Sequence, residues 1–202
     1  MLQITQNCKV FYPSQEINVK ALKTISTESD AWIGLIPAHV ESREENANDN
    51  HDVNYFYSNK DSWCLRGGEP GRYEIRWFPK DSQSEQIGVG IPIIINYFKV
   101  SDPWVYERGR IEITYDFTSF NGKPEPLESN AWIGLVPVSV KSRSEEENDK
   151  HDICWFYLNS EKKGENVLSA PSEGLYEVRA FSKDNGGVQI GVGIPVVVIS
   201  RQ

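Results

Sequence analysis

The sequence predicts an all-β protein made of two tandem immunoglobulin-like antiparallel β-sandwich domains that are related by internal duplication. β-forming segments recur along the whole chain, glycine and proline separate them, and the spacing of apolar residues indicates no amphipathic helix. Residues 30–59 also match residues 130–159 without a gap, so that Trp32 corresponds to Trp132. The repeat indicates that a whole domain was duplicated, because its period is too long for a solenoid unit.

The repeat places the two domains at residues 1–98 and 99–202, each near the commonest domain size. Within the first domain, Tyr73, Ile75 and Trp77 alternate with charged residues, which is the period of a half-buried strand. The same reasoning predicts strands at residues 8–12, 16–22, 31–40, 52–58, 72–78 and 86–95, and at residues 104–107, 110–117, 131–140, 152–158, 175–181 and 189–199. Residues 96–104 then form the connection between the domains.

Framework motifs follow one another in a similar order in both halves. In the second half they are V-Y at 105–106, W-I-G-L at 132–135, W-F-Y at 155–157, G-L-Y-E-V-R at 174–179 and G-I-P at 193–195. This order resembles the SKICH domain and other immunoglobulin-like sandwiches with a W-I-G strand, over about 90 residues of each half. The resemblance implies a non-catalytic module that is used for protein contact and membrane localisation. These are mostly framework residues, which specify a fold rather than a function.

The chain has a net charge of −8, which argues against nucleic acid and anionic membranes as simple electrostatic partners. Two segments, residues 41–52 and 141–152, hold most of this excess of negative charge. No apolar stretch is long enough to be a signal peptide or to span a bilayer. We therefore expect a soluble protein without a membrane span.

The three cysteines, Cys8, Cys64 and Cys154, occupy positions that do not correspond between the repeats. A duplicated disulfide framework is therefore excluded, and the odd number favours free thiols in a reducing compartment. We expect a cytoplasmic location. A mature secreted protein whose signal peptide has been removed is the alternative.

The two acidic segments suggest a cation site in each domain. Calcium takes six to eight oxygen ligands from carboxylates, amides, carbonyls and water, and each segment offers several of these groups. The candidate metal ligands are Glu45, Asn48, Asp49, Asp52 and Asp81, and their counterparts Glu145, Asn148, Asp149, Asp152 and Asp184. The alternative is a solvated charged loop, in which Asp and Asn make local turn bonds to the backbone.

The expected directions of the strands add Asp81 and Asp184 to the candidate ligands. If successive strands alternate in direction, two strands separate residues 41–52 from the hairpin at 79–85, so both lie at one end of the sandwich. The hairpin residues Asp81 and Asp184 are then close to the acidic segments and complete the sites.

His51 and His151 stand beside carboxylates in both repeats, and we expect them to take part in binding. Histidine in this setting serves as a zinc ligand or a general base. Zinc needs three or four ligands, but each copy shares only one histidine and no cysteine. Cys154 corresponds to Asn54, so no nucleophile is shared either. We therefore predict no catalytic residues and no enzyme.

Aromatic residues near acidic and amide groups are typical of sugar-binding sites, and here they include Trp32, Tyr55, Tyr57, Trp77, Trp132, Trp155 and Tyr157. Most of them fall inside predicted strands, so packing in the core is the better explanation. Trp63 and Trp104 lie in predicted connections instead. We expect those two to be exposed or to lie at an interface.

The expected function is a non-enzymatic tandem β-sandwich that acts as a binding or scaffold module, with calcium at the matched acidic segments and a protein as partner. The alternative is a calcium-dependent carbohydrate-binding protein of the lectin or adhesion type. Two equivalent sites in one chain also suit bivalent recognition.

Overall fold

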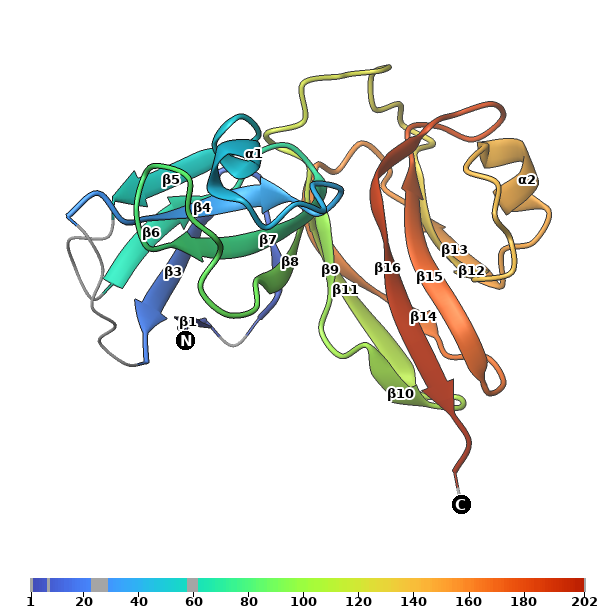
Figure 1. Ribbon diagram of the computed structural model, residues 1–202. Helices are drawn as coiled ribbons and strands as arrows, with labels where there is room; N and C mark the ends of the chain where they lie inside the picture. The colour runs from blue at the N-terminus through green and yellow to red at the C-terminus, as the bar shows by residue number, and fades with distance from the viewer. Residues whose placement is uncertain (1, 7, 23–28, 58–61, 202) are drawn as a thin grey trace. The chain divides into compact units, whose positions relative to one another are not determined.

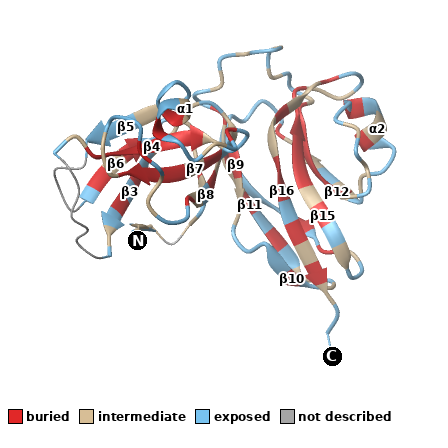
Figure 2. Ribbon diagram, viewed as in Figure 1, coloured by how far each residue is buried: buried red, intermediate tan, exposed pale blue. Residues whose placement is uncertain are grey.

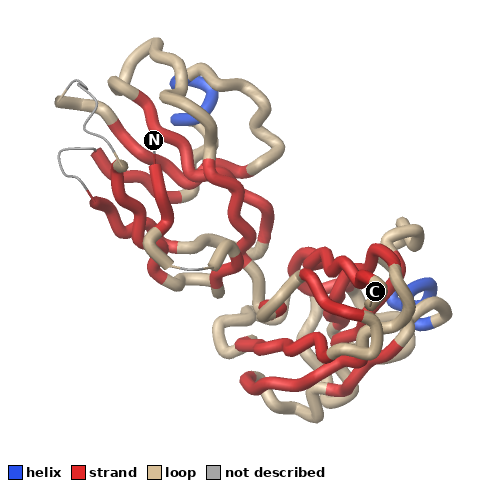
Figure 3. Tube along the Cα trace, turned by 90° about the horizontal axis from the view of Figure 1, so that it is seen from below, coloured by secondary structure: helices blue, strands red, loops and turns tan. Residues whose placement is uncertain are grey.

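The computed structural model describes residues 2–6, 8–22, 29–57 and 62–201, and residue 58 of the predicted strand 52–58 lies outside these. It confirms two tandem immunoglobulin-like β-sandwich domains. The chain divides into two compact units, Met1–Asn96 and Tyr97–Gln202, and each carries one short helix beside its strands (Figures 1 and 3). No helix among the described residues has the length and apolar character needed to cross a bilayer.

The first unit pairs a three-stranded sheet with a five-stranded sheet. The smaller sheet has the order β1 (Leu2–Ile4), β3 (Glu16–Ala21) and β6 (Ser62–Arg66). The larger sheet has the order β2 (Val10–Phe11), β8 (Ile91–Ile95), β7 (Gly71–Phe78), β4 (Trp32–Pro37) and β5 (Asn54–Tyr57). All neighbouring strands are antiparallel except β2 and β8, which are parallel.

The second unit repeats this topology. Its smaller sheet has the order β14 (Lys163–Ser169), β11 (Arg110–Asp116) and β9 (Phe98–Val100). Its larger sheet has the order β10 (Trp104–Tyr106), β16 (Gln189–Ile199), β15 (Gly174–Phe181), β12 (Trp132–Pro137) and β13 (Cys154–Tyr157). Strand β9 lies inside the predicted connection 96–104 and pairs with β11.

The core of each unit lies between its two sheets, as the alternation of side chains requires. In the first unit, Ile17 and Val19 of β3 face Ile33, Leu35 and Ile75 of the larger sheet, and all five side chains are fully buried. Figure 2 shows the buried residues concentrated on the central strands of both units. This arrangement gives each domain its own hydrophobic core.

Strands β6 and β14 were not predicted, and they change the position expected for Trp63. Trp63 lies in β6, packs in the core and is 7% exposed, so the expectation of an exposed Trp63 is wrong. Trp104 is 62% exposed on the edge strand β10, which confirms the expectation for that residue.

The acidic segments do not stay at one tip of the sandwich. Residue Ala38 donates its backbone N–H to Arg72 O at the start of β7, whereas Glu45 N–H reaches Ser84 O beyond the end of β7. Val53 N–H then bonds to Leu35 O, which returns the chain to β4. Residues 38–53 therefore cross the outer face of the larger sheet, and residues 138–153 do the same in the second unit. We call them the cover segments.

Three strands, β5, β6 and β7, separate the first cover segment from the hairpin, so the prediction that two strands separate them is wrong. The segment reaches the hairpin by crossing the sheet instead. Each cover segment contains one short helix, α1 (Glu45–Asp49) or α2 (Glu145–Asp149). Beneath the first one, Trp32 stacks on Phe78 with ring centroids 4.5 Å apart, in a small apolar cluster separate from the main core.

Candidate functional site

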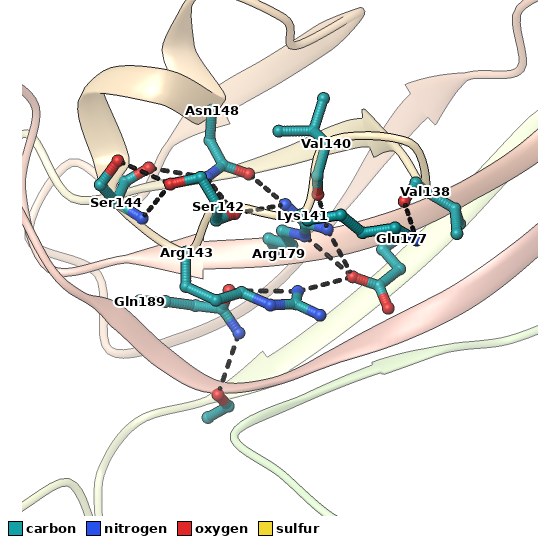
Figure 4. A network of polar contacts seen from close by, with 11 residues as sticks. Val138, Val140, Lys141, Ser142, Arg143, Ser144, Asn148, Glu177, Arg179 and Gln189 are labelled. Carbon is teal, nitrogen blue, oxygen red and sulfur yellow. Dashed lines mark hydrogen bonds and ion pairs between the residues drawn. The ribbon is translucent and has the colours of Figure 1, made fainter.

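A buried arginine fixes each cover segment to the sheet, and Figure 4 shows the contacts of the one in the second unit. In the second unit, Arg179 of β15 is 1% exposed and donates through Nη1 to Asn148 Oδ1 at 2.5 Å and to Ser142 O at 3.2 Å. Its Nη2 donates to Val140 O at 2.9 Å, and its Nε donates to Glu177 Oε2 at 2.9 Å. The planar guanidinium thus satisfies three acceptors of the cover segment and one carboxylate of its own strand.

The first unit repeats this clamp with Arg76, which donates to Asn48 Oδ1 at 2.5 Å, Val40 O at 2.7 Å and Glu74 Oε2 at 2.9 Å. The amide nitrogen of Asn48 donates to Ser42 O at 3.1 Å, as that of Asn148 does in the second unit. Asn48 and Asn148 were predicted as metal ligands. The structure commits both side chains to the clamp, which explains why the two repeats share them.

The clamp carboxylates Glu74 and Glu177 each face two arginines. Arg143 Nη1 donates to Glu177 Oε2 at 2.6 Å, the same oxygen that accepts from Arg179 Nε. Burial alone would raise the pKa of Glu177, but the two guanidinium groups outweigh burial and lower it. A Cβ atom at position 193 would lie 2.7 Å from Glu177 Oε2, so Gly193 provides the space that this carboxylate needs. The glycine of the predicted G-I-P motif therefore serves the clamp.

The residues next to the clamp asparagines form a carboxylate cluster in each unit. Glu45, Asp49 and the hairpin residue Asp81 each offer an oxygen within 4.8 Å of the others. Glu145, Asp149 and Asp184 form the equivalent cluster. These six residues were all predicted as metal ligands, and the structure brings them together in two groups of three. Two oxygen ligands on opposite sides of a calcium ion lie about 4.6–5.2 Å apart. The three oxygens of each group are therefore close enough to bind one ion together.

Like charges are concentrated in each cluster. The pKa of Glu45 is raised by burial and by the nearby carboxylates Asp49 and Asp81, against the opposing effect of the Gln83 backbone N–H. Among the described residues, no lysine or arginine forms an ion pair with any of the six carboxylates. A bound cation would relieve this repulsion.

Glu145 is the buried member of the second cluster. The residue is 2% exposed, and its Oε2 accepts a hydrogen bond from the Gly186 backbone N–H at 2.8 Å. Its other oxygen, Oε1, is buried and has no hydrogen-bond partner among the described residues. A buried carboxylate oxygen without a partner costs folding free energy. A bound cation is the partner that satisfies such an oxygen best.

A tyrosine of the edge strand contacts each cluster. Tyr57 Oη donates to Asp81 Oδ2 at 2.7 Å, and Tyr157 Oη donates to Asp184 Oδ2 at 2.9 Å. The hydrogen bond to Asp81 and the negative charge of the Asp81 carboxylate raise the pKa of Tyr57 to about 12. Sequence reasoning placed these tyrosines in the core. Both repeats carry a tyrosine at this position, at the same distance after the acidic segment. This repetition is the signal that could have linked the two tyrosines to the site.

The remaining predicted residues lie outside the two groups of three carboxylates. Burial and Asp149 raise the pKa of Asp152 to about 6, and the Asp152 Oδ2 atom is buried without a partner among the described residues. Its counterpart Asp52 also has a raised pKa, first through burial. The histidines differ between the units, since His51 Nδ1 contacts Ala47 O at 2.8 Å whereas His151 Nε2 contacts Glu147 Oε1 at 3.0 Å.

Several aromatic side chains that were expected in the core are exposed beside the clusters. Trp32 and Trp132 are buried, but Tyr55 is 48% exposed and Trp155 is 47% exposed. These exposed rings lie on β5 and β13, each of which pairs with only one strand of its sheet. Alternation along the sequence identified two faces of each strand, but it could not show that the outer face of an edge strand stays open.

No protein-family model matches the chain, and no curated protein matches its sequence. Among solved structures, the D0–D1 domain of intimin is similar, with a TM-score of 0.42 and 8% identity, over 96% of this chain and 98% of that one. The fibronectin(III)-like modules of Clostridium thermocellum CbhA are similar with a TM-score of 0.29 and 14% identity, over 100% of this chain and 95% of that one.

A third similar structure is the Bacteroides ovatus mixed-linkage glucan utilization locus protein SGBP-B, in complex with a mixed-linkage heptasaccharide. It has a TM-score of 0.29 and 11% identity, over 98% of this chain and 45% of that one. All these TM-scores are low. The fold assignment therefore rests on the strand order of the chain itself, and the function rests on its own residues.

Proposed function

We propose that the protein is a non-enzymatic tandem binding module that holds one calcium ion in each domain. Glu45, Asp49 and Asp81 hold the first ion, and Glu145, Asp149 and Asp184 hold the second. The observation that carries this proposal is the buried, unpartnered Oε1 of Glu145 within a group of three carboxylates.

The donor set supports calcium over zinc or magnesium. All six side chains are carboxylates, and hard oxygen donors suit calcium, whereas zinc sites are usually built from cysteine and histidine. Magnesium demands near-ideal octahedral geometry and keeps several waters. A cluster that joins a short helix to a hairpin has the flexible geometry that calcium tolerates.

The placement of the polar residues also supports a role without catalysis. Cys154 donates its thiol to Ser169 O at 3.4 Å, and burial raises the pKa of this thiol, which lowers its reactivity. His151 is held by Glu147, a residue of its own cover segment. Neither arrangement is that of a nucleophile activated by a base.

Part of the proposal concerns partners and location. The SKICH-like order of framework motifs favours a protein partner, and the three cysteines, which form no disulfide, favour a reducing compartment such as the cytoplasm. Two equivalent ion sites in one chain would give each partner two points of attachment.

Thermal unfolding with calcium and with chelator tests the ion sites. At a calcium concentration about 100 times the dissociation constant, binding adds about 2.7 kcal/mol to the stability of the domain that binds it. The double variant Asp149→Asn with Asp184→Asn is expected to lose the calcium response of the second domain. The matched control is Glu112→Gln with Glu165→Gln, which removes the same charge from the smaller sheet and is expected to keep the response. No calcium response in the unaltered protein would refute the proposal.

A further inference from the structure

The exposed aromatic pair of β13 lies next to the second carboxylate cluster. Trp155 is 47% exposed, and its ring centroid lies 4.5 Å from that of Tyr157. Tyr157 in turn donates its hydroxyl to Asp184 of the cluster. One continuous surface therefore joins the open face of an indole, a phenol and a group of carboxylates.

The residue opposite Trp155 is a glycine, and the ring of Trp132 lies against its backbone. Gly134 of β12 pairs with Trp155, and a Cβ atom at position 134 would lie 3.3 Å from Trp155 Cβ and 2.6 Å from the Trp132 ring. The first unit has the same layout, with Gly34 opposite Tyr55 and with Tyr57 bonded to Asp81. The repetition shows that the aromatic surface and the cluster occur together.

A cation in the second cluster would keep free coordination positions. Calcium takes six to eight oxygens, and three carboxylates fill all of these only if every one of them binds through both oxygens. Glu145 Oε2 already accepts the Gly186 N–H, which leaves Oε1 as the oxygen of this side chain that has no partner among the described residues. Asp149 is exposed, so the open positions face solvent and are available to water or to a ligand oxygen.

The charge of the loaded site favours a neutral ligand. Three carboxylates and one calcium ion leave a net charge of −1, and Asp152 stands nearby, since Asp149 contributes to its raised pKa. This balance disfavours acidic peptides and phosphates. A neutral polyol with two adjacent hydroxyls can complete the coordination of the ion while its apolar face stacks on an aromatic ring.

We propose that the second domain binds a neutral sugar residue with vicinal hydroxyls, which coordinates the calcium ion held by Glu145, Asp149 and Asp184 and stacks on Trp155. This inference rests on the proposed function, because the ion must bind first. Tyr157 links the two parts of the site, since its ring contacts Trp155 and its hydroxyl holds Asp184.

A glycan array probed with the full chain, with calcium and with chelator, provides the first test. Binding to neutral glycans in calcium and its loss in chelator are expected. The array also carries sialylated and sulfated glycans, and exclusive binding to those would overturn the proposal, as would the absence of any calcium-dependent binding.

Titration with methyl α-mannoside, methyl β-galactoside and methyl α-fucoside, followed by calorimetry, locates the site. The background is Asp49→Asn with Asp81→Asn, which removes the first ion site. On this background, Trp155→Ala is expected to weaken the binding of the sugar by about tenfold or more while it leaves calcium affinity unchanged. The matched control is Trp104→Ala, which removes another exposed tryptophan from the opposite edge of the same sheet and is expected to leave sugar binding unchanged.

The two levels of the proposal fail in different ways. If calcium binds but none of the three glycosides does, or if Trp155→Ala and Trp104→Ala bind the sugar equally well, the sugar site is refuted and the ion sites stand. If calcium itself does not bind, both the sugar site and the proposed function are refuted. Calcium-dependent binding of an acidic peptide at Trp155 in place of a sugar would also overturn the inference.

Discussion

Arg179 on β15 donates to Asn148 Oδ1 on α2 at 2.5 Å, and Arg76 on β7 donates to Asn48 Oδ1 on α1 at the same distance. This relationship orients each short helix, because the asparagine points inward to the sheet. Its neighbour in the sequence, Asp149 in the second unit, belongs to the carboxylate cluster. The clamp therefore positions the cluster as well as the cover segment.

Replacement of Asn148 by alanine is expected to destabilise the second domain and to weaken calcium binding together. Arg179 would lose an acceptor for a buried charge, and hydrogen bonds to charged groups contribute about 1.5–3 kcal/mol. Denaturant unfolding measures the loss of stability. Asn166→Ala on the exposed strand β14 is the control, with an expected change within about 0.5 kcal/mol. A normal calcium affinity in Asn148→Ala would show that the clamp does not position the cluster.

The clamp also predicts a dependence of stability on acid pH. The arginines lower the pKa of Glu177 in the folded state below its usual value of 4.5. A carboxyl group with a lowered pKa stabilises the fold fully above its unfolded pKa, and this contribution is lost as the pH falls through the folded pKa. The stability difference between the unaltered protein and Glu177→Gln should therefore be constant near neutral pH and should shrink below about pH 4.5. Denaturant unfolding between pH 3 and pH 7 measures it, and a difference that grows at low pH would contradict the assignment.

Ionisation of Asp152 is expected to have the opposite effect on the stability of the fold. Its pKa is raised to about 6 by burial and by Asp149, so its ionised form is disfavoured in the folded state. It does not affect stability below the unfolded pKa, and it costs stability as the pH rises toward about 6. In the presence of chelator, Asp152→Asn is expected to stabilise the protein at pH 7 by about 1–2 kcal/mol and to have little effect at pH 3.5. A stabilisation that is equal at both pH values would show that ionisation is not its cause.

Trp63 and Trp104 provide a test of the fold. Trp63→Ala is expected to reduce the unfolding free energy of the first domain by about 3–5 kcal/mol, because it empties a filled position of the core. Trp104→Ala, at a position that is 62% exposed, should change stability by less than about 0.5 kcal/mol. Equal effects of the two replacements would contradict the placement of β6 in the core.

The sequence predicted two tandem β-sandwiches and most of their strands, because the repeat and the alternation of apolar residues can be read directly from the sequence. It missed β14, which runs through Lys163–Ser169 with a single buried residue, Leu168, and has no apolar alternation. It missed β6 because Ser62–Arg66 is too short a run for its alternation to distinguish it from a connection. Such strands are defined by pairing with distant residues, which a local pattern does not reveal.

The carboxylate clusters were predicted for a partly wrong reason. Glu45 and Asp49 were identified by their repetition, but Asp81 was brought in by a count of strands that omitted β6. The cover segment reaches the hairpin because its hydrogen bonds with Arg76 hold it across the outer face of the sheet. The alternation in strand 72–78 predicts that Arg76 lies on the polar face, and it does not distinguish a buried arginine from a solvated one.

The most direct test of the account is a calorimetric titration of the full chain with calcium, followed by the same titration of variants. The account predicts two ions per chain, one ion after Asp149→Asn with Asp184→Asn, and none after Asp49→Asn and Asp81→Asn are added. Calcium that does not bind at millimolar concentration, or a stoichiometry that these replacements leave unchanged, would contradict it.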